Sequence, residues 1–122
     1  MSNKTAKTED TPNYHRMMDE VIEKKDRIPE YEPLFLACQD RSALIYLFLY
    51  ADYGVHGRWL EAEPRILEDA DTAIQYARYV VKGRWPEAEL IILENEKKTA
   101  DYIKLLRDLG LEQDVAEFML KC

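Results

Sequence analysis

The segment VKGRWPEAELIIL, residues 81–93, is the most informative part of the chain because a second version of it, VHGRWLEAEPRIL, occupies residues 55–67. Aligned without gaps, both contain Gly-Arg-Trp, then Glu-Ala-Glu, then Ile-Leu. A fainter version, RIPEYEPLFL, lies at residues 27–36. Self-similarity at a period of roughly 20–50 residues indicates stacked supersecondary units. The sequence therefore predicts three related units.

Each unit has the pattern of a short helix followed by a longer one. Pro86 stands where proline favours a helix start, and the acidic residues after it suit the positive end of the helix dipole. The longer helix is predicted at TAIQYARYVVK, residues 72–82. Its apolar face is formed by Ala73, Ala77, Val80 and Val81. Gly83 is expected at the C-terminal cap of this helix.

No segment alternates as a β-strand does, so the predicted fold is an all-α helical-repeat array of about three helix-turn-helix units. One domain is expected over residues 11–122, after a polar and disordered tail at residues 1–10. The predicted units are residues 27–57, 58–83 and 84–110, and the predicted capping helices are residues 12–26 and 111–121. The inward residues of the capping helices are expected to be Tyr14, Met17, Met18, Val21, Val115, Phe118 and Met119.

Two questions about this array stay open. The helical pattern of residues 86–109 either runs through as one helix or is broken near Asn95. The units either stack as an open solenoid or close into a compact bundle.

Composition narrows the class of protein. The chain has 122 residues, of which 47% are hydrophobic and 34% charged, which is enough for one folded domain. Its 17 basic residues are interleaved with 24 acidic ones, so direct binding of duplex nucleic acid is not expected. The longest apolar run, residues 43–51, is about half of what a membrane span needs. With no leader pattern and two distant cysteines, Cys38 and Cys122, we expect a cytoplasmic protein.

The repeated Arg-Trp pairs are predicted to be structural joints: Arg58 with Trp59, and Arg84 with Trp85. A buried tryptophan removes roughly 150–250 Å² of surface from water, and one per unit suits a wedge between units. Carboxylates two positions apart on a helix point in different directions, so the Glu-x-Glu pairs do not form a catalytic or metal site. One glutamate of each pair is expected to bind an arginine of its own or a neighbouring unit.

No combination of residues predicts catalysis. His15 and His56 are the only histidines, and neither has a neighbouring Cys or Ser that would form an activated nucleophile. The chain also lacks a glycine-rich phosphate loop and the spacing of a zinc site. We therefore expect no enzyme activity, no cofactor and no metal.

A polar stripe opposite the apolar face of residues 72–82 is the candidate partner-binding surface. It consists of Gln75, Arg78, Tyr79 and Lys82, and the same positions in the next unit are Asp101, Lys104, Leu105 and Asp108. Tyr79 and Leu105 are expected to face outward, and rows of exposed apolar residues on consecutive repeats are where arrays bind partners. The predicted partner-binding residues are Arg78, Tyr79, Lys82 and Leu105.

The segment YARYVVKGRWPEAELII, residues 76–92, resembles a short helical repeat found in proteins of tailed bacteriophages and large DNA viruses. The resemblance covers residues 45–109, and the earlier copy departs from the pattern at Leu60, where proline is usual. It implies a helical array of viral or prophage origin and carries no catalytic residue with it.

These observations favour a non-enzymatic protein-binding module, specifically a phage or prophage accessory protein that binds and inhibits or redirects a host protein in the host cytoplasm. The alternatives are a homo-oligomeric structural component and an acidic decoy for a nucleic-acid-binding channel. The sequence leaves open the identity of the target and whether the chain forms a homodimer.

Overall fold

The computed structural model describes residues 12–122, and this part of the chain is helical without a β-strand. The predicted all-α fold class is confirmed. The disordered tail predicted at residues 1–10 lies outside the described residues.

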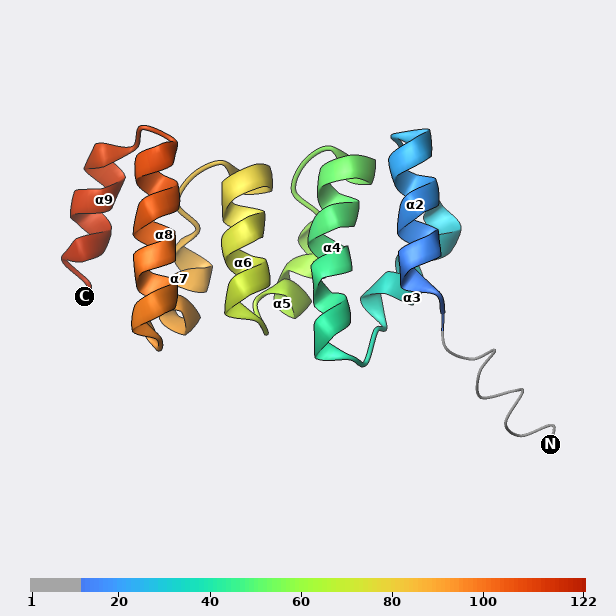
Figure 1. Ribbon diagram of the computed structural model, residues 1–122, viewed down its shortest axis with the longest axis horizontal. Coiled ribbons are helices and arrows are strands. Elements are labelled where there is room, and N and C mark those ends of the chain that lie inside the picture. Colours follow the sequence, from blue (N-terminus) through green and yellow to red (C-terminus); the bar gives the residue numbers. More distant parts are fainter. Residues whose placement is uncertain (1–11) are drawn as a thin grey trace.

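The longer helices stand side by side in a row along the long axis of the molecule (Figure 1). They are α2 (Tyr14–Lys24), α4 (Ile45–Tyr50), α6 (Ala70–Tyr76) and α8 (Glu96–Asp108). The turn Arg41–Leu44 leads into α4. Two wider turns, η3 (Ala51–Val55) and η5 (Ala77–Val81), continue α4 and α6 without a break. Only with these turns included are α4 and α6 longer than the helices on the other side of the row. The row therefore presents one face made of parallel helix ridges.

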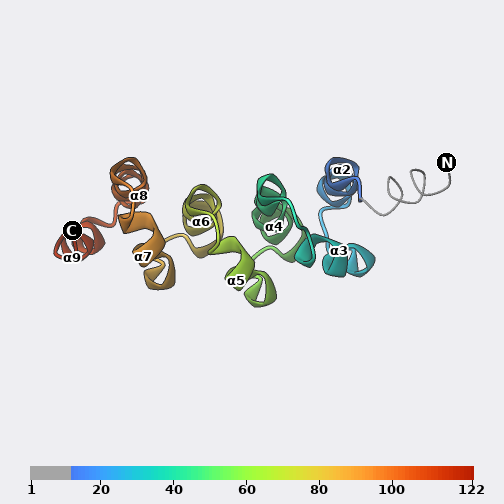
Figure 2. The same cartoon turned by 90° about the horizontal axis from the view of Figure 1, so that it is seen from below.

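The short helices lie on the opposite side of this row (Figure 2). They are α3 (Glu32–Leu36), α5 (Glu63–Ile66) and α7 (Pro86–Leu93). The single turns Pro29–Tyr31 and Leu60–Ala62 precede α3 and α5. The last helix, α9 (Glu112–Met119), lies beside α8 at the C-terminal end of the row (Figure 1).

Side-chain caps mark where α6 and α8 begin. The carboxylate of Asp69 accepts a hydrogen bond from the backbone N–H of Thr72 at the start of α6. The side chain of Asn95 accepts from the N–H groups of Lys97 and Lys98 at the start of α8. Such caps satisfy N–H groups that have no partner within the helix. Residues 86–109 are consequently two helices, broken at Asn95.

The ends of the middle helices differ from the predicted glycine cap. The backbone N–H of Lys82 donates to Ala77 O at 2.7 Å, five residues back, and Lys82 itself has the left-handed φ of 60°. His56 closes η3 in the same way, with φ of 63°. Gly83 is therefore not the left-handed cap residue, and a Cβ there would make only an ordinary contact with Leu111. In this part of the fold a wide turn, rather than glycine, ends the helix.

Trp59 and Trp85 lie between consecutive units. Each is almost fully buried, and their rings pack against Tyr50 and Tyr76 of the preceding unit with centroids 4.8 and 4.9 Å apart. Tyr102 is the equivalent tyrosine of the last unit, and there Phe118 of α9 takes the place of the tryptophan, with ring centroids 4.8 Å apart. Aromatic pairs at this separation add to the free energy gained from burial alone. The last helix thus supplies the aromatic ring that a further unit would otherwise bring.

Within each unit a hydrogen-bonded network ties the short helix to the long one. Arg84 Nε and Nη2 both donate to the Glu89 carboxylate at 2.8 Å. The Tyr102 hydroxyl donates to Glu89 at 2.8 Å and accepts the backbone N–H of Trp85 at 2.8 Å. Bidentate charge-assisted pairs of this kind are the strong class of hydrogen bond. Arg58 with Glu63 and Tyr76, and Arg27 with Glu32 and Tyr50, repeat the arrangement.

Glu89 is the most deeply placed of the three network carboxylates. It is fully buried and also accepts a hydrogen bond from Lys121 at 2.7 Å. Burial alone would raise its pKa, but the hydrogen bonds from Arg84, Lys121 and Tyr102 outweigh this and lower the pKa to about 2. Glu89 is therefore ionised at neutral pH and holds both helices of its unit.

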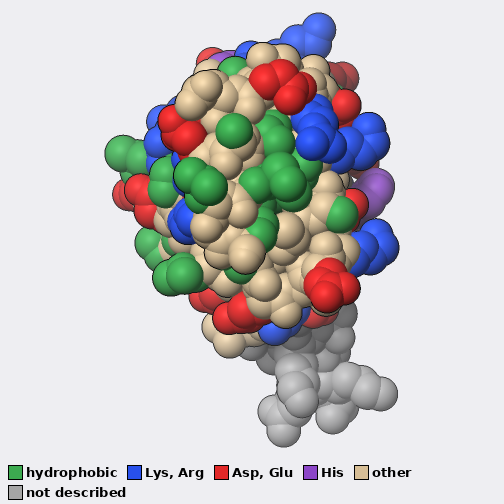
Figure 3. All heavy atoms as spheres, turned by 90° about the vertical axis from the view of Figure 1, so that its left-hand side faces the viewer, with side chains coloured by type: hydrophobic (Ala, Val, Ile, Leu, Met, Phe, Trp, Pro, Cys, Tyr) green, Lys and Arg blue, Asp and Glu red, His purple; other side chains and the backbone are tan. Residues whose placement is uncertain are grey.

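The two capping helices bury most of the residues that the sequence assigns to the core. Met17, Met18 and Val21 of α2 are buried, and so are Val115 and Phe118 of α9, whereas Tyr14 is half-buried. Met119 was predicted to face inward, but it is 50% exposed. Hydrophobic side chains are visible on this C-terminal end of the molecule (Figure 3). Adjacent helical positions point in different directions, and α9 directs Phe118 into the core and Met119 away from it.

Candidate partner-binding groove

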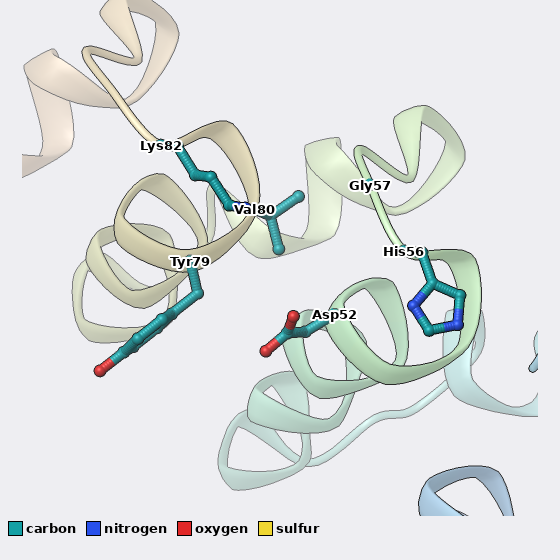
Figure 4. A pocket seen from close by; sticks show the side chains of 6 residues that line it. All are labelled: Asp52, His56, Gly57, Tyr79, Val80 and Lys82. Carbon is teal, nitrogen blue, oxygen red and sulfur yellow. The ribbon is translucent and has the colours of Figure 1, made fainter. Parts of the chain in front are cut away.

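A groove of about 360 Å³ lies between α4–η3 and α6–η5 (Figure 4). It is lined by Asp52, His56, Gly57, Tyr79, Val80 and Lys82. Two of these residues, Tyr79 and Lys82, belong to the partner-binding set predicted from the sequence. We call this site the α4/α6 groove.

Tyr79 forms one wall of the groove. Its ring packs against Phe48 of α4, with centroids 6.0 Å apart and an interplanar angle of 35°. The side chain nevertheless remains 50% exposed. Tyrosine combines a large rigid apolar surface with a polar hydroxyl, so a half-exposed, well-supported tyrosine suits contact with a partner.

Asp52 of η3 and His56, the residue directly after η3, form the other wall. In Figure 4 the Asp52 carboxylate extends toward the side of the groove that carries Tyr79. His56 Nε2 lies 2.8 Å from the carbonyl oxygen of Lys25. Because a carbonyl only accepts, Nε2 carries the hydrogen and donates it, which ties the end of η3 to the end of α2. This wall is thereby held in place from outside the groove.

Neither residue of this second wall is predicted from the sequence. Asp52 stands 26 positions before Arg78, at the same place in its unit, and carries the opposite charge. His56 was assigned no function because it lacks a catalytic neighbour, a criterion that does not address binding. Positions 26 residues apart occupy the same place in consecutive units and form one column of the repeat. A charge that changes sign within such a column was the signal in the sequence that could have identified Asp52.

The gap between α6 and α8, here called the α6/α8 gap, is lined by Arg78, the third of the four predicted residues. Arg78 Nη1 bonds to Asp108 Oδ2 at 3.0 Å across this gap, and Lys104 lies 3.2 Å from the same oxygen. Arg78 thus faces away from the α4/α6 groove and toward the next unit.

Leu105 is predicted to face outward at the position equivalent to Tyr79, and this prediction is wrong. It is fully buried, although Tyr79 occupies the same column and is half exposed. α8 continues as a regular helix through Leu105, while Tyr79 lies in the wide turn η5. A wide turn shifts the phase of the side chains, so equivalent sequence positions need not point the same way.

The signs of the two charges are exchanged between the two gaps. At the α6/α8 gap the pair is the cation Arg78 and the anion Asp108. The equivalent positions, 26 residues earlier, hold the anion Asp52 and the cation Lys82. The first pair is in contact at 3.0 Å. Within residues 12–122, neither Asp52 nor Lys82 makes an ion pair, with each other or with another residue. The charges at the α4/α6 groove are therefore unpaired where the corresponding charges at the α6/α8 gap are paired.

The groove offers binding groups: a carboxylate, an ammonium group, an imidazole and an aromatic ring. In the described part of the chain, no three His, Cys, Asp or Glu side chains lie together as metal ligands would. None of the helices from residue 12 onward is long and apolar enough to span a bilayer.

Comparisons with models of known protein families, with curated proteins and with solved structures found no match to this chain. The resemblance of residues 76–92 to a viral helical repeat consequently stays a prediction from the sequence.

Proposed function

We propose that this protein is a non-enzymatic protein-binding module and that its partner docks in the α4/α6 groove. The observation that carries the proposal is the pair of opposite charges, Asp52 and Lys82, without ion-pair partners in residues 12–122, on either side of a groove walled by the half-exposed Tyr79. A partner that supplies the missing opposite charges gains both ion pairs and the contact with the tyrosine.

The position of the groove in the array supports this proposal. It lies between two middle units of the row, where both walls are anchored by buried joints at Trp59 and Trp85. Helical arrays bind partners on surfaces formed by adjacent repeats, because the repeats supply a rigid and extended frame. A rigid frame also lowers the entropic cost of ordering the interface.

The viral resemblance gives this proposal a biological setting. We infer a phage or prophage accessory protein that acts in the cytoplasm of the host cell and binds a host protein, such as a defence or regulatory factor, to inhibit or redirect it. The resemblance of residues 76–92 supports the origin, and the groove supports the mode of action.

Affinity capture from bacterial lysate tests the proposal. The wild-type protein is expected to retain one dominant host protein, and Tyr79→Ala is expected to lose most of it, since the substitution removes one wall of the groove. Tyr53→Ala is the matched control because Tyr53 occupies the same column one unit earlier, is 41% exposed and does not line the groove.

Two results would contradict the proposal. Capture that survives Tyr79→Ala would show that the partner does not use the groove. Equal losses in Tyr79→Ala and Tyr53→Ala, with both variants folded by circular dichroism, would place the interface elsewhere on the helix row.

A further inference from the structure

The α6/α8 gap shows which groups the α4/α6 groove lacks. Arg78 places a guanidinium against the carboxylate of Asp108, so this gap satisfies its own charges. In the α4/α6 groove the two corresponding positions hold Asp52 and Lys82, whose charges are opposite but not in contact. A group that enters this groove has to complement both charges.

We propose that the α4/α6 groove binds a protein segment that presents an arginine next to a carboxylate, with the guanidinium between Asp52 and Tyr79 and the carboxylate at Lys82. This inference rests on the proposed function and names the chemistry of the partner. The occupant is a dipolar peptide surface, such as a helix with Arg and Glu one turn apart.

Arginine fits the Asp52 side better than lysine does. A guanidinium can bind a carboxylate in a bidentate manner and can also lie against an aromatic ring. Tyr79 and Asp52 line the same groove from opposite walls, and the half-exposed Tyr79 ring leaves surface for such a contact. A lysine ammonium would gain only the point-charge interaction.

The second charge excludes simpler occupants. A purely anionic ligand, such as a phosphate chain, would be attracted by Lys82 but repelled by Asp52. A purely cationic segment would be attracted by Asp52 but repelled by Lys82. The volume of about 360 Å³ also suits a few side-chain groups rather than a large ligand.

The test is an NMR titration of the isotope-labelled protein with a blocked alanine-based helical peptide that contains one Arg and one Glu four residues apart. We expect saturable shifts of the amide signals of Asp52, Tyr79 and Lys82. Replacing the peptide arginine by glutamine, or its glutamate by glutamine, is expected to weaken binding about tenfold, because each change removes one charge-assisted contact. Replacing the arginine by lysine keeps the charge but loses the bidentate and stacking geometry, so it is expected to weaken binding less.

The chain itself supplies the blocking variant. Asp52→Arg with Lys82→Asp copies the charges of Arg78 and Asp108 into the groove and should close it, which abolishes peptide binding. The matched control, Arg78→Asp with Asp108→Lys, changes the same number of charges in the α6/α8 gap and should leave the shifts at Asp52 and Tyr79 unchanged. Asp52→Asn provides a milder test, with about tenfold weaker binding expected.

Two outcomes overturn the inference. If the shifts do not saturate, or if the peptide binds wild type and Asp52→Asn equally well, Asp52 is not a binding site for arginine. Equal affinity for the peptide that lacks glutamate removes the carboxylate site at Lys82. If lysate capture still depends on Tyr79 in either case, the proposed function stands and only the partner chemistry is wrong; if that dependence also fails, both are wrong.

Discussion

The α4/α6 groove and the α6/α8 gap are built on the same buried frame but have different surfaces. Beneath each, a tryptophan packs on the tyrosine of the preceding unit, and an arginine, a glutamate and a tyrosine form the same network. At the surface, Arg78 pairs with Asp108 across the second gap, whereas Asp52 and Lys82 at the first one have no ion-pair partner within residues 12–122.

This difference separates residues that hold the array together from residues that can interact with a partner. Removal of a buried group leaves a cavity or an unsatisfied charge, which costs several kcal/mol. An exposed ion pair contributes much less because water and salt screen it. The surface of a unit can therefore change its charges while its joint stays the same.

The largest effect is expected for the buried frame. Trp85→Ala should lower the free energy of unfolding by about 3–5 kcal/mol, since it empties a fully buried site against Tyr76. Chemical denaturation monitored by circular dichroism measures this loss. Trp85→Phe is the control and should cost less, because it keeps a ring in the joint and removes an indole N–H that has no partner within the described residues.

The frame interpretation of Trp85 has a clear counter-result. If Trp85→Ala left the melting temperature unchanged and abolished partner capture, the repeated Gly-Arg-Trp segment would be a binding site rather than a joint.

The next effect compares two residues of one repeat column. Leu105→Ala should cost about 2–5 kcal/mol because Leu105 is fully buried. Tyr79→Ala should cost less than this, because the Tyr79 side chain is already half exposed and loses only its partial burial and its contact with Phe48. Denaturant unfolding of both variants tests this order, and equal losses would show that the two gaps do not differ at this column.

A smaller effect, on the pH dependence of stability, should distinguish the Glu89 network from the networks of the other units. The pKa of Glu89 is lowered from an ordinary value of 4.5 to about 2, so its contribution to stability is complete above pH 4.5 and is lost as the pH falls toward 2. Glu89→Gln should make the stability less dependent on pH in this window, which denaturation at a series of pH values would show.

Glu32 is the matched control for this measurement. The hydrogen bond from Arg27 also lowers the Glu32 pKa, but the side chain is 15% exposed and has no lysine partner within residues 12–122. Glu32→Gln should therefore flatten the pH dependence less than Glu89→Gln. The opposite order would mean that burial and Lys121 do not strengthen the third network.

The smallest effect on stability is expected at the closed surface. Arg78→Gln removes the ion pair with Asp108, whose pKa Arg78 and Lys104 hold below its ordinary value. Because Asp108 is exposed, the change in melting temperature should be smaller than for any substitution above. A thermal melt measures it, and a loss as large as that of Leu105→Ala would show that the surface pair is part of the frame.

The repeat in the sequence was sufficient to predict the structural joints. The recurrence of Arg-Trp and of Glu two positions after Glu predicted a buried aromatic wedge and an arginine–glutamate pair, and the structure has both at Trp85 and between Arg84 and Glu89. The network tyrosines could be aligned but not assigned, because Tyr102 reaches back 17 residues to Trp85 N. Sequence spacing gives no information on such a contact.

Local sequence determined the helical class, the order of short and long helices, and the joints, because helical periodicity and recurrence are properties of the chain itself. Tertiary structure decided which residues of a column reach the surface. Tyr79 and Leu105 share a column, but Tyr79 lies in a wide turn and Leu105 in a regular helix. Whether opposite charges meet depends on where their side chains lie in space, so only the tertiary structure shows that Arg78 reaches Asp108 while Asp52 and Lys82 stay apart.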